Sequence, residues 1–163
     1  MLVLGIDPGL AITGYAVVAE EGATLRLITT GVVRTSAEAP SPQRLRTLYA
    51  GLQKIIQEFQ PEAAAIEELF FSRNVRTAMA VSQARGVTLL ALADAGLPIV
   101  EYTPMQVKQA VTGYGNADKR QVQKMVQLLL NLSEIPRPDD AADAVAVAIC
   151  YTHRARLDKL LGT

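Results

Sequence analysis

The feature that most restricts the fold of this chain is a short apolar segment, residues 2–6, which ends at the carboxylate Asp7. Such a segment, bounded by turn formers, is typical of a buried strand and is too short for a helix. Asp7-Pro8-Gly9 interrupts it, and the run that begins at Thr13-Gly14 predicts a second strand folding back on the first. An acid at the end of a central strand, beside a glycine-containing turn, lies where a metal ion or a phosphate would be held. Asp7 is therefore the first candidate site residue.

The strands that follow predict an α/β fold. Residues 25–33 alternate as a third strand of an antiparallel meander, with one face made by Leu25, Leu27, Thr29, Gly31 and Val33. Helical spacing then predicts a helix from about Ser41 to Gln60, which Pro61 ends. The apolar residues 63–66 form the next strand, and a right-handed helical crossover lays it parallel to the first. With residues 98–102 as the fifth strand, we expect a mixed sheet, a three-strand antiparallel meander plus two parallel strands, flanked by helices.

Four further features concern the helices. Residues 75–95 predict a helix that is apolar almost all round, which needs cover on more than one side and is either a core helix or a subunit interface. A short helix follows the cap residue Thr103 with Pro104 at its first position. An amphipathic helix then carries Lys119 on its outer face, and a last helix runs from about Asp139 to Leu161.

The whole-chain properties place limits on the class of protein. A length of 163 residues suits one domain over residues 1–163. The formal net charge of zero does not itself indicate nucleic-acid binding, although residues 69–137 hold eight basic residues against four acids, either a basic face or ordinary helix surface. The single cysteine, Cys150, is expected to be a buried small hydrophobe. With neither a leader nor a membrane span in the pattern, we expect a cytoplasmic protein.

Acids gather where the predicted elements end. The first and fourth strands are parallel, so Asp7 and Glu67 are expected at the same edge of the sheet. The last helix opens with Asp139-Asp140, and Asp140 shares a face with Asp143 three residues on. Because aspartate also favours helix N-caps and first turns, Asp139 can serve the helix alone. The approach of this helix to the sheet is eased by its small residues Ala141, Ala142, Ala144, Ala146 and Ala148.

Four carboxylates with neither a histidine pair nor a cysteine cluster favour Mg²⁺ or Mn²⁺ over Zn²⁺. Two such ions about 3.5–4 Å apart would clamp the attacking and leaving oxygens of a phosphodiester. The competing interpretation is that the acids are scattered and only structural. His153 lies off the face of Asp143 and is expected at the surface.

The chain resembles a known family in four places that keep their order. These are Gly-Ile-Asp7-Pro-Gly with Thr13-Gly14, Glu67 followed by Phe70, the stretch from Gln106-Val-Lys108-Gln to Lys119-Arg-Gln-Val-Gln123, and Asp140-Ala-Ala-Asp143-Ala. They are similar to the RuvC family of Holliday-junction resolvases, within the ribonuclease-H-like superfamily. The similarity covers nearly the whole chain.

The resemblance implies a metal-dependent, structure-selective DNA endonuclease of homologous recombination and DNA repair. It implies a homodimer that nicks two opposed strands of a four-way DNA junction symmetrically, leaving 5′-phosphate and 3′-hydroxyl ends, and that works with a branch-migration motor. Mg²⁺, for which Mn²⁺ can substitute, would be bound as two ions by Asp7, Glu67, Asp140 and Asp143. Lys108 and Lys119 would lie near the scissile phosphate, with Lys119 also catalytic, and Phe70 would contact or unstack bases. Arg76 and Arg120, in the same basic stretch, are further candidates for DNA contact.

Two assignments stay open because acids adjoin each other. A one-residue shift of the fourth strand would exchange Glu67 with Glu68, and Asp139 adjoins Asp140. Three other functions compete. The Asp-x-Gly turn also opens the phosphate-binding hairpin of actin-like ATPases and sugar kinases, which need two such domains. An RNase-H-like enzyme that processes structured RNA and a non-catalytic junction-binding protein are the others, and metal-dependent cleavage separates the last from a nuclease.

Overall fold

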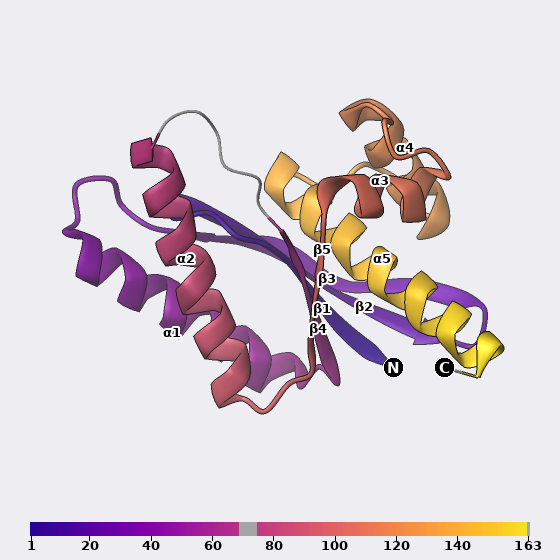
Figure 1. Ribbon diagram of the computed structural model, residues 1–163, viewed down its shortest axis with the longest axis horizontal. Coiled ribbons are helices and arrows are strands. Elements are labelled where there is room, and N and C mark those ends of the chain that lie inside the picture. Colours follow the sequence, from indigo (N-terminus) through magenta and orange to yellow (C-terminus); the bar gives the residue numbers. More distant parts are fainter. Residues whose placement is uncertain (69–74, 163) are drawn as a thin grey trace.

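The computed structural model describes residues 1–68 and 75–162, and its centre is a five-stranded sheet in the order β3-β2-β1-β4-β5 (Figure 1). The strands are β1 (Leu2–Asp7), β2 (Ile12–Glu21), β3 (Thr24–Arg34), β4 (Ala63–Glu67) and β5 (Ile99–Tyr102). β1 and β2 pair antiparallel, as do β2 and β3, whereas β4 lies parallel to both β1 and β5. The prediction of a mixed sheet is confirmed.

Helices cover both faces of this sheet, as Figure 1 shows. One face carries α1 (Ser41–Phe59) and α2 (Val75–Asp94), and the other carries α5 (Asp139–Leu161). The shorter helices α3 (Pro104–Thr112) and α4 (Lys119–Leu129) pack beside α5. Both short helices begin at a capping box, Thr103 with Gln106 and Asp118 with Gln121, in which side chains satisfy the free backbone N–H groups.

Side chains alternate between the two faces of the sheet along β1 and β4, and the acids that end these strands lie on the face covered by α5. Leu4 and Ile6 are fully buried in the core beneath α1 and α2, and Val3 is buried in the core beneath α5. Because side chains alternate along a strand, Asp7 points to the same side as Val3. By the same rule Glu67 follows Ala65, which also belongs to the core beneath α5.

Two glycines of the sheet, Gly5 and Gly14, allow the backbone of α5 to pack directly against β1 and β2. A methyl group at Gly5 would overlap the carbonyl oxygen of Ala144, and one at Gly14 would overlap the carbonyl oxygen of Asp140. The five small residues of α5 that were expected to allow this approach are all buried: Ala141, Ala142, Ala144, Ala146 and Ala148. Side-chain-free positions on β1 and β2 therefore let the start of α5 approach the end of β1.

The prediction that one face of β3 carries Leu25, Leu27, Thr29, Gly31 and Val33 is wrong. The pairing of β2 with β3 shifts register between Val17 and Val18. Leu25 and Leu27 consequently pack beneath α5, whereas Val33 packs against the core beneath α1 and α2. A bulge adds one residue to one strand only, so the sides exchange beyond it.

Two single-residue expectations have different outcomes. Cys150 is buried, as predicted. His153 is not a surface residue, because it is half-buried and its Nδ1 lies 3.0 Å from the carbonyl oxygen of Ala110, at the contact of α3 with α5. Within residues 1–68 and 75–162, no helix has the length and apolar character needed to cross a membrane.

Candidate active site

Asp7 and Glu67 end neighbouring parallel strands. Ile6 of β1 is in register with Ile66 of β4, so the next residue of each strand, Asp7 and Glu67, comes to the same edge. The turn after Asp7 is held by Thr13, whose hydroxyl donates to the carbonyl oxygen of Gly9 at 2.6 Å. The same oxygen of Thr13 accepts from the Gly9 N–H at 3.2 Å. The predicted pair of acids is thus set by strand register and a closed turn.

These two carboxyl groups are poorly accommodated as anions. Burial, and then the charges of Glu67, Asp143 and Asp140, raise the pKa of Asp7 to about 8. Burial is also the main cause that raises the pKa of Glu67, followed by the charge of Asp143. A hydrogen bond between the two acids raises the pKa of Asp7 and lowers that of Glu67, so the two carboxyl groups influence each other's titration.

The first turns of α5 add the remaining acids. Asp140 and Asp143 both act electrostatically on Asp7, and burial raises the pKa of Asp143 despite its contact with Lys119. Glu67, not Glu68, is the residue that lies against Asp7. Glu68 is exposed, and its backbone N–H donates to the carbonyl oxygen of Tyr102 at 2.7 Å. The structure brings together Asp7, Glu67, Asp140 and Asp143.

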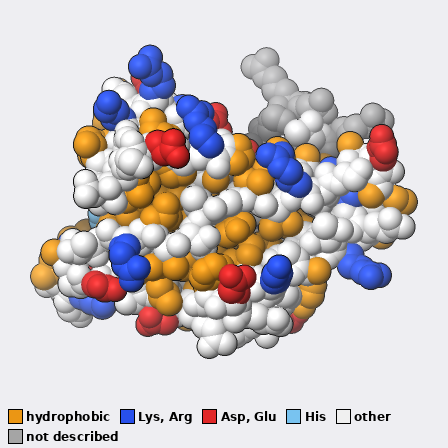
Figure 2. Space-filling view, turned by 180° about the vertical axis from the view of Figure 1, so that it is seen from behind, with side chains coloured by type: hydrophobic (Ala, Val, Ile, Leu, Met, Phe, Trp, Pro, Cys, Tyr) orange, Lys and Arg blue, Asp and Glu red, His pale blue; other side chains and the backbone are white. Residues whose placement is uncertain are grey.

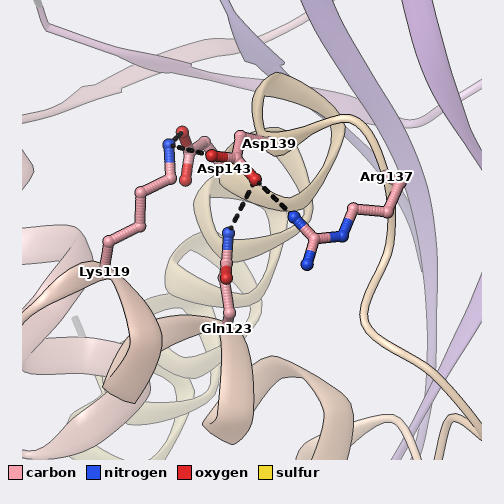
Figure 3. A network of polar contacts seen from close by, with 5 residues as sticks. All are labelled: Lys119, Gln123, Arg137, Asp139 and Asp143. Atoms are coloured by element: carbon pink, nitrogen blue, oxygen red, sulfur yellow. Dashed lines mark hydrogen bonds and ion pairs between the residues drawn. The ribbon is translucent and has the colours of Figure 1, made fainter.

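Lys119 connects α4 to this cluster (Figure 3). Its Nζ donates to Oδ2 of Asp143 at 3.0 Å and lies 3.3 Å from Oδ2 of Asp139. Burial alone would lower the pKa of the Lys119 amine, but the hydrogen bonds and charges of Asp143 and Asp139 raise it overall. The ammonium group of Lys119 therefore stays charged beside the acids.

Asp139 holds Lys119 rather than joining the cluster. It is the first residue of α5, after the N-cap residue Pro138. Its Oδ1 accepts from Nε2 of the buried Gln123 at 3.1 Å and from Nη1 of Arg137 at 3.0 Å, as Figure 3 shows. The hydrogen bond and charge of Lys119 lower the pKa of Asp139. Asp139 thus has three partners of its own, which distinguishes it from Asp140.

The donor set suits a hard divalent cation. Oxygen ligands from several carboxylates are what Mg²⁺ and Mn²⁺ prefer, and mutual repulsion of buried acids is relieved by a cation. Among the described residues, no group of three acidic, histidine or cysteine side chains is already arranged around one cation position. Positive charge beside the acids is supplied by the ammonium group of Lys119, which pairs with Asp143. Binding of a cation would displace this ammonium group from Asp143.

The structure describes the side chains of three of the five residues predicted to contact DNA: Lys108, Lys119 and Arg120. Lys108 of α3 is half-buried, and its charge, like that of Lys119, lowers the pKa of Glu67, so both lysines lie at the acids. Arg120 is exposed on α4. Phe70 and the side chain of Arg76 lie outside the described part of the structure. Sequence reasoning missed Gln123, although it lies four residues from Lys119 and therefore on the same helix face.

Comparison with known proteins covers almost the whole chain. The profile of the family described as crossover junction endodeoxyribonuclease RuvC matches residues 3–151. Relatives of that name from Chloroflexus aggregans and Alkaliphilus metalliredigens are 59% and 54% identical to it. The first alignment covers 95% of this chain and 94% of the relative, and the second covers 98% of each.

Solved structures agree with the sequence comparison. The chain is similar to T. thermophilus RuvC in complex with Holliday junction substrate, with a TM-score of 0.91, 42% identity and 96% of each chain covered. It is also similar in fold to the yeast mitochondrial Holliday junction resolvase Ydc2, with a TM-score of 0.73 at 14% identity, over 96% of this chain and 80% of that one. The predicted ribonuclease-H-like resolvase fold is confirmed.

Proposed function

The chain belongs to the RuvC family of crossover junction endodeoxyribonucleases, and from this premise we propose that it resolves four-way DNA junctions by metal-dependent nicks in two opposed strands. The ends produced are a 5′-phosphate and a 3′-hydroxyl, and the process served is homologous recombination and DNA repair. The observation that supports the proposal best is the meeting of Asp7 and Glu67, at the ends of paired parallel strands, with two acids of α5.

The proposed site divides its work among three kinds of side chain. Asp7, Glu67, Asp140 and Asp143 would hold Mg²⁺, or Mn²⁺ in its place, and four carboxylates suit two ions. When bound, such ions polarise the scissile phosphate and lower the pKa of water. Lys119, released from Asp143 but still held by Asp139, would contact the scissile phosphate, and Lys108 would contribute a second positive charge. Opposite charge placed where the transition state becomes more negative lowers its free energy.

The test is cleavage of a synthetic immobile four-way junction with Mg²⁺, with Mn²⁺ and with a chelator, mapped on each labelled strand. We expect paired symmetric nicks that require the cation. Glu67→Gln should slow cutting at least about 100-fold, because it removes a charge that would hold the ion and each 1.4 kcal/mol is tenfold in rate. Glu68→Gln is the matched control and should cut within about twofold of the native rate.

Two outcomes would assign another function. Tight binding of the junction without cuts, across varied crossover sequences and both cations, would leave a junction-binding protein. Cleavage of structured RNA together with inert four-way DNA would indicate an RNA-processing enzyme. Equal loss of activity in both glutamate variants would contradict the assignment of Glu67 as the ligand.

We also propose that the exposed face of α2 forms a homodimer. The buried face of α2 includes Ala84, Thr88 and Ala91, whereas Met79 is 60% exposed and Leu90 is 54% exposed. Gln83 and Gly86 are exposed between these two, so one stripe at helical spacing brings two apolar side chains, a glycine and one uncharged polar side chain to the surface. A twofold dimer would present two identical sites to a nearly twofold junction.

Leu90→Glu is expected to shift the protein to monomers, because a buried charge without a partner is costly at an interface. Sedimentation measures the change, and paired nicks should become single, uncoupled nicks. Leu160→Glu is the control, since Leu160 is 79% exposed near the end of α5. An unchanged dimer in Leu90→Glu would exclude this face as the interface.

Three further proposals rest on the family. A branch-migration motor would be the partner that moves the junction. The site of work would be the cytoplasm, where bacteria such as those of the compared relatives keep their DNA. Residues 1–163 would act as one nuclease domain.

A further inference from the structure

The helix α4 has two faces with different neighbours. Lys119 and Gln123 point to the acids at the start of α5 (Figure 3). Beside them, α4 borders an open hollow of about 520 Å³ that lies outside the acid cluster. Its other wall is the end of α3 and the segment between the two helices, and it is lined by Thr112, Tyr114, Ala117, Asp118, Arg120, Gln121, Lys124 and Met125.

The lining of the hollow holds more positive than negative charge, with Arg120 and Lys124 against Asp118. Arg120 and Lys124 lie four residues apart on α4, both exposed, and neither has an ion pair or a side-chain hydrogen bond within residues 1–68 and 75–162. The acid in the lining, Asp118, is engaged as the N-cap, where it accepts from the Gln121 N–H at 2.9 Å. Figure 2 shows Lys and Arg side chains standing out from the end of the molecule that α3 and α4 form. Such a pair of free cations is suited to phosphate.

An aromatic side chain lies at the same hollow. Tyr114 is 58% exposed, although its backbone is well held. Its N–H donates to the hydroxyl of Thr112 at 3.1 Å, and its carbonyl oxygen accepts from the Ala117 N–H at 3.1 Å. An exposed ring on a fixed turn beside unpaired cations is the combination that binds unstacked bases of DNA, since the ring stacks while the cations hold the backbone.

We propose that this hollow binds one unstacked nucleotide of the junction strand that leaves the active site, with its base on Tyr114 and its phosphates on Arg120 and Lys124. The inference rests on the proposed function. Lys119 and Arg120 are adjacent on α4, so a strand whose scissile phosphate lies at Lys119 reaches the hollow by passing around one helix. The volume is in the range of pockets that hold small organic ligands, which a nucleotide matches.

The experiment measures binding of an immobile junction with Ca²⁺ in a Glu67→Gln background, which separates binding from cutting. Tyr114→Ala should weaken binding about tenfold, within the range of one base–aromatic stack, whereas Tyr114→Phe should bind within about twofold. Arg120→Gln and Lys124→Gln should each reduce the slope of log affinity against log salt by about 1. Lys54→Gln, an exposed lysine on α1 across the sheet, is the control and should change neither quantity.

A second readout locates the base. With 2-aminopurine at successive positions of the cut strand, one position near the crossover should lose fluorescence on binding, and Tyr114→Ala should restore it. Native affinity and unchanged fluorescence in Tyr114→Ala would overturn the proposal, as would an effect of the cations alone, which indicates phosphate contact without stacking. If the native chain binds and cuts junctions while Tyr114→Ala is unchanged, only this inference fails. If the native chain binds no junction, the proposed function fails with it. Thermal melting of each variant excludes loss of fold.

Discussion

Asp7→Asn is expected to abolish junction cutting and, at the same time, to make the metal-free protein more stable at alkaline pH. The pKa of Asp7 is raised from 3.8 to about 8 by burial and by the neighbouring acids. Between these two values the folded chain keeps a proton that the unfolded chain releases, so the free energy of unfolding falls as the pH rises. Above about pH 8 the folded chain carries the whole cost of an extra buried charge. Asparagine has nearly the same shape and never acquires that charge.

The gain should be largest above pH 8 and should vanish only well below pH 3.8, where Asp7 is protonated in both states. Because Asp7 is half-buried, water screens part of its charge, and we expect a gain on the order of 2 kcal/mol, or about 4–8 °C in melting temperature. Melting curves at pH 4, 7 and 9 with a chelator measure the effect. Mg²⁺ should raise the melting temperature of the native chain more than that of Asp7→Asn, since the cation relieves the same repulsion.

Glu68→Gln is the control for this comparison, because Glu68 is exposed one residue beyond the cluster. It should leave the pH dependence of stability and the response to Mg²⁺ unchanged. A melting temperature of Asp7→Asn equal to that of the native chain at pH 9 would contradict the raised pKa. Residual cutting by Asp7→Asn near the native rate would contradict its role as a ligand.

Gly14→Ala is expected to remove the site without touching an acid. The added methyl group would overlap the backbone of Asp140, at the first turn of α5. A backbone oxygen cannot rotate away as a flexible side chain can, so α5 must move and take Asp140 and Asp143 with it. Overpacking of a core costs about 1–3 kcal/mol and occasionally more, and we expect at least the upper end here. Cutting should fall at least about 100-fold, since several kcal/mol of charge stabilisation depend on these acids.

Gly51→Ala is the matched control. Gly51 lies in α1, where the nearest atom to an added methyl group is in the side chain of Val33 at 2.8 Å, so a side chain and not a backbone must shift, and alanine favours a helix by about 1 kcal/mol over glycine. Chemical denaturation and junction cutting measure both variants. Native stability and activity in Gly14→Ala would show that α5 does not depend on the close approach. Gly5→Ala should repeat the effect of Gly14→Ala, because it meets the same helix at Ala144.

The local sequence pattern was sufficient to predict the strands and helices and most of the acids that meet at the end of β1. Apolar spacing, Pro61 and the cap at Thr103 depend on neighbours in the chain, so they could be interpreted without a structure. The meeting of Asp7 with Glu67 also follows from a general rule, since a right-handed crossover brings the ends of parallel strands to one edge.

Other features depend on residues that are distant in sequence. The bulge in β2–β3 arises from pairing, which no single strand specifies, and it exchanged the faces of β3. The position of His153 depends on the packing of α3 against α5, and that of Lys119 on the distance from α4 to α5. The choice between Glu67 and Glu68 needed the register of β4 with β1.

The amino-acid sequence by itself determined the order of strands and helices, the parallel pair that ends in Asp7 and Glu67, and the acids available to a cation. Only the tertiary structure decided how these acids are used. In the folded chain Asp139 contacts Lys119, Gln123 and Arg137, whereas Asp140 and Asp143 lie over the sheet. The close packing of α5 on the sheet depends on Gly14. The physical reason is that periodicity is a local property, whereas the pKa of a buried acid and the partner of a long side chain depend on atoms brought together by folding.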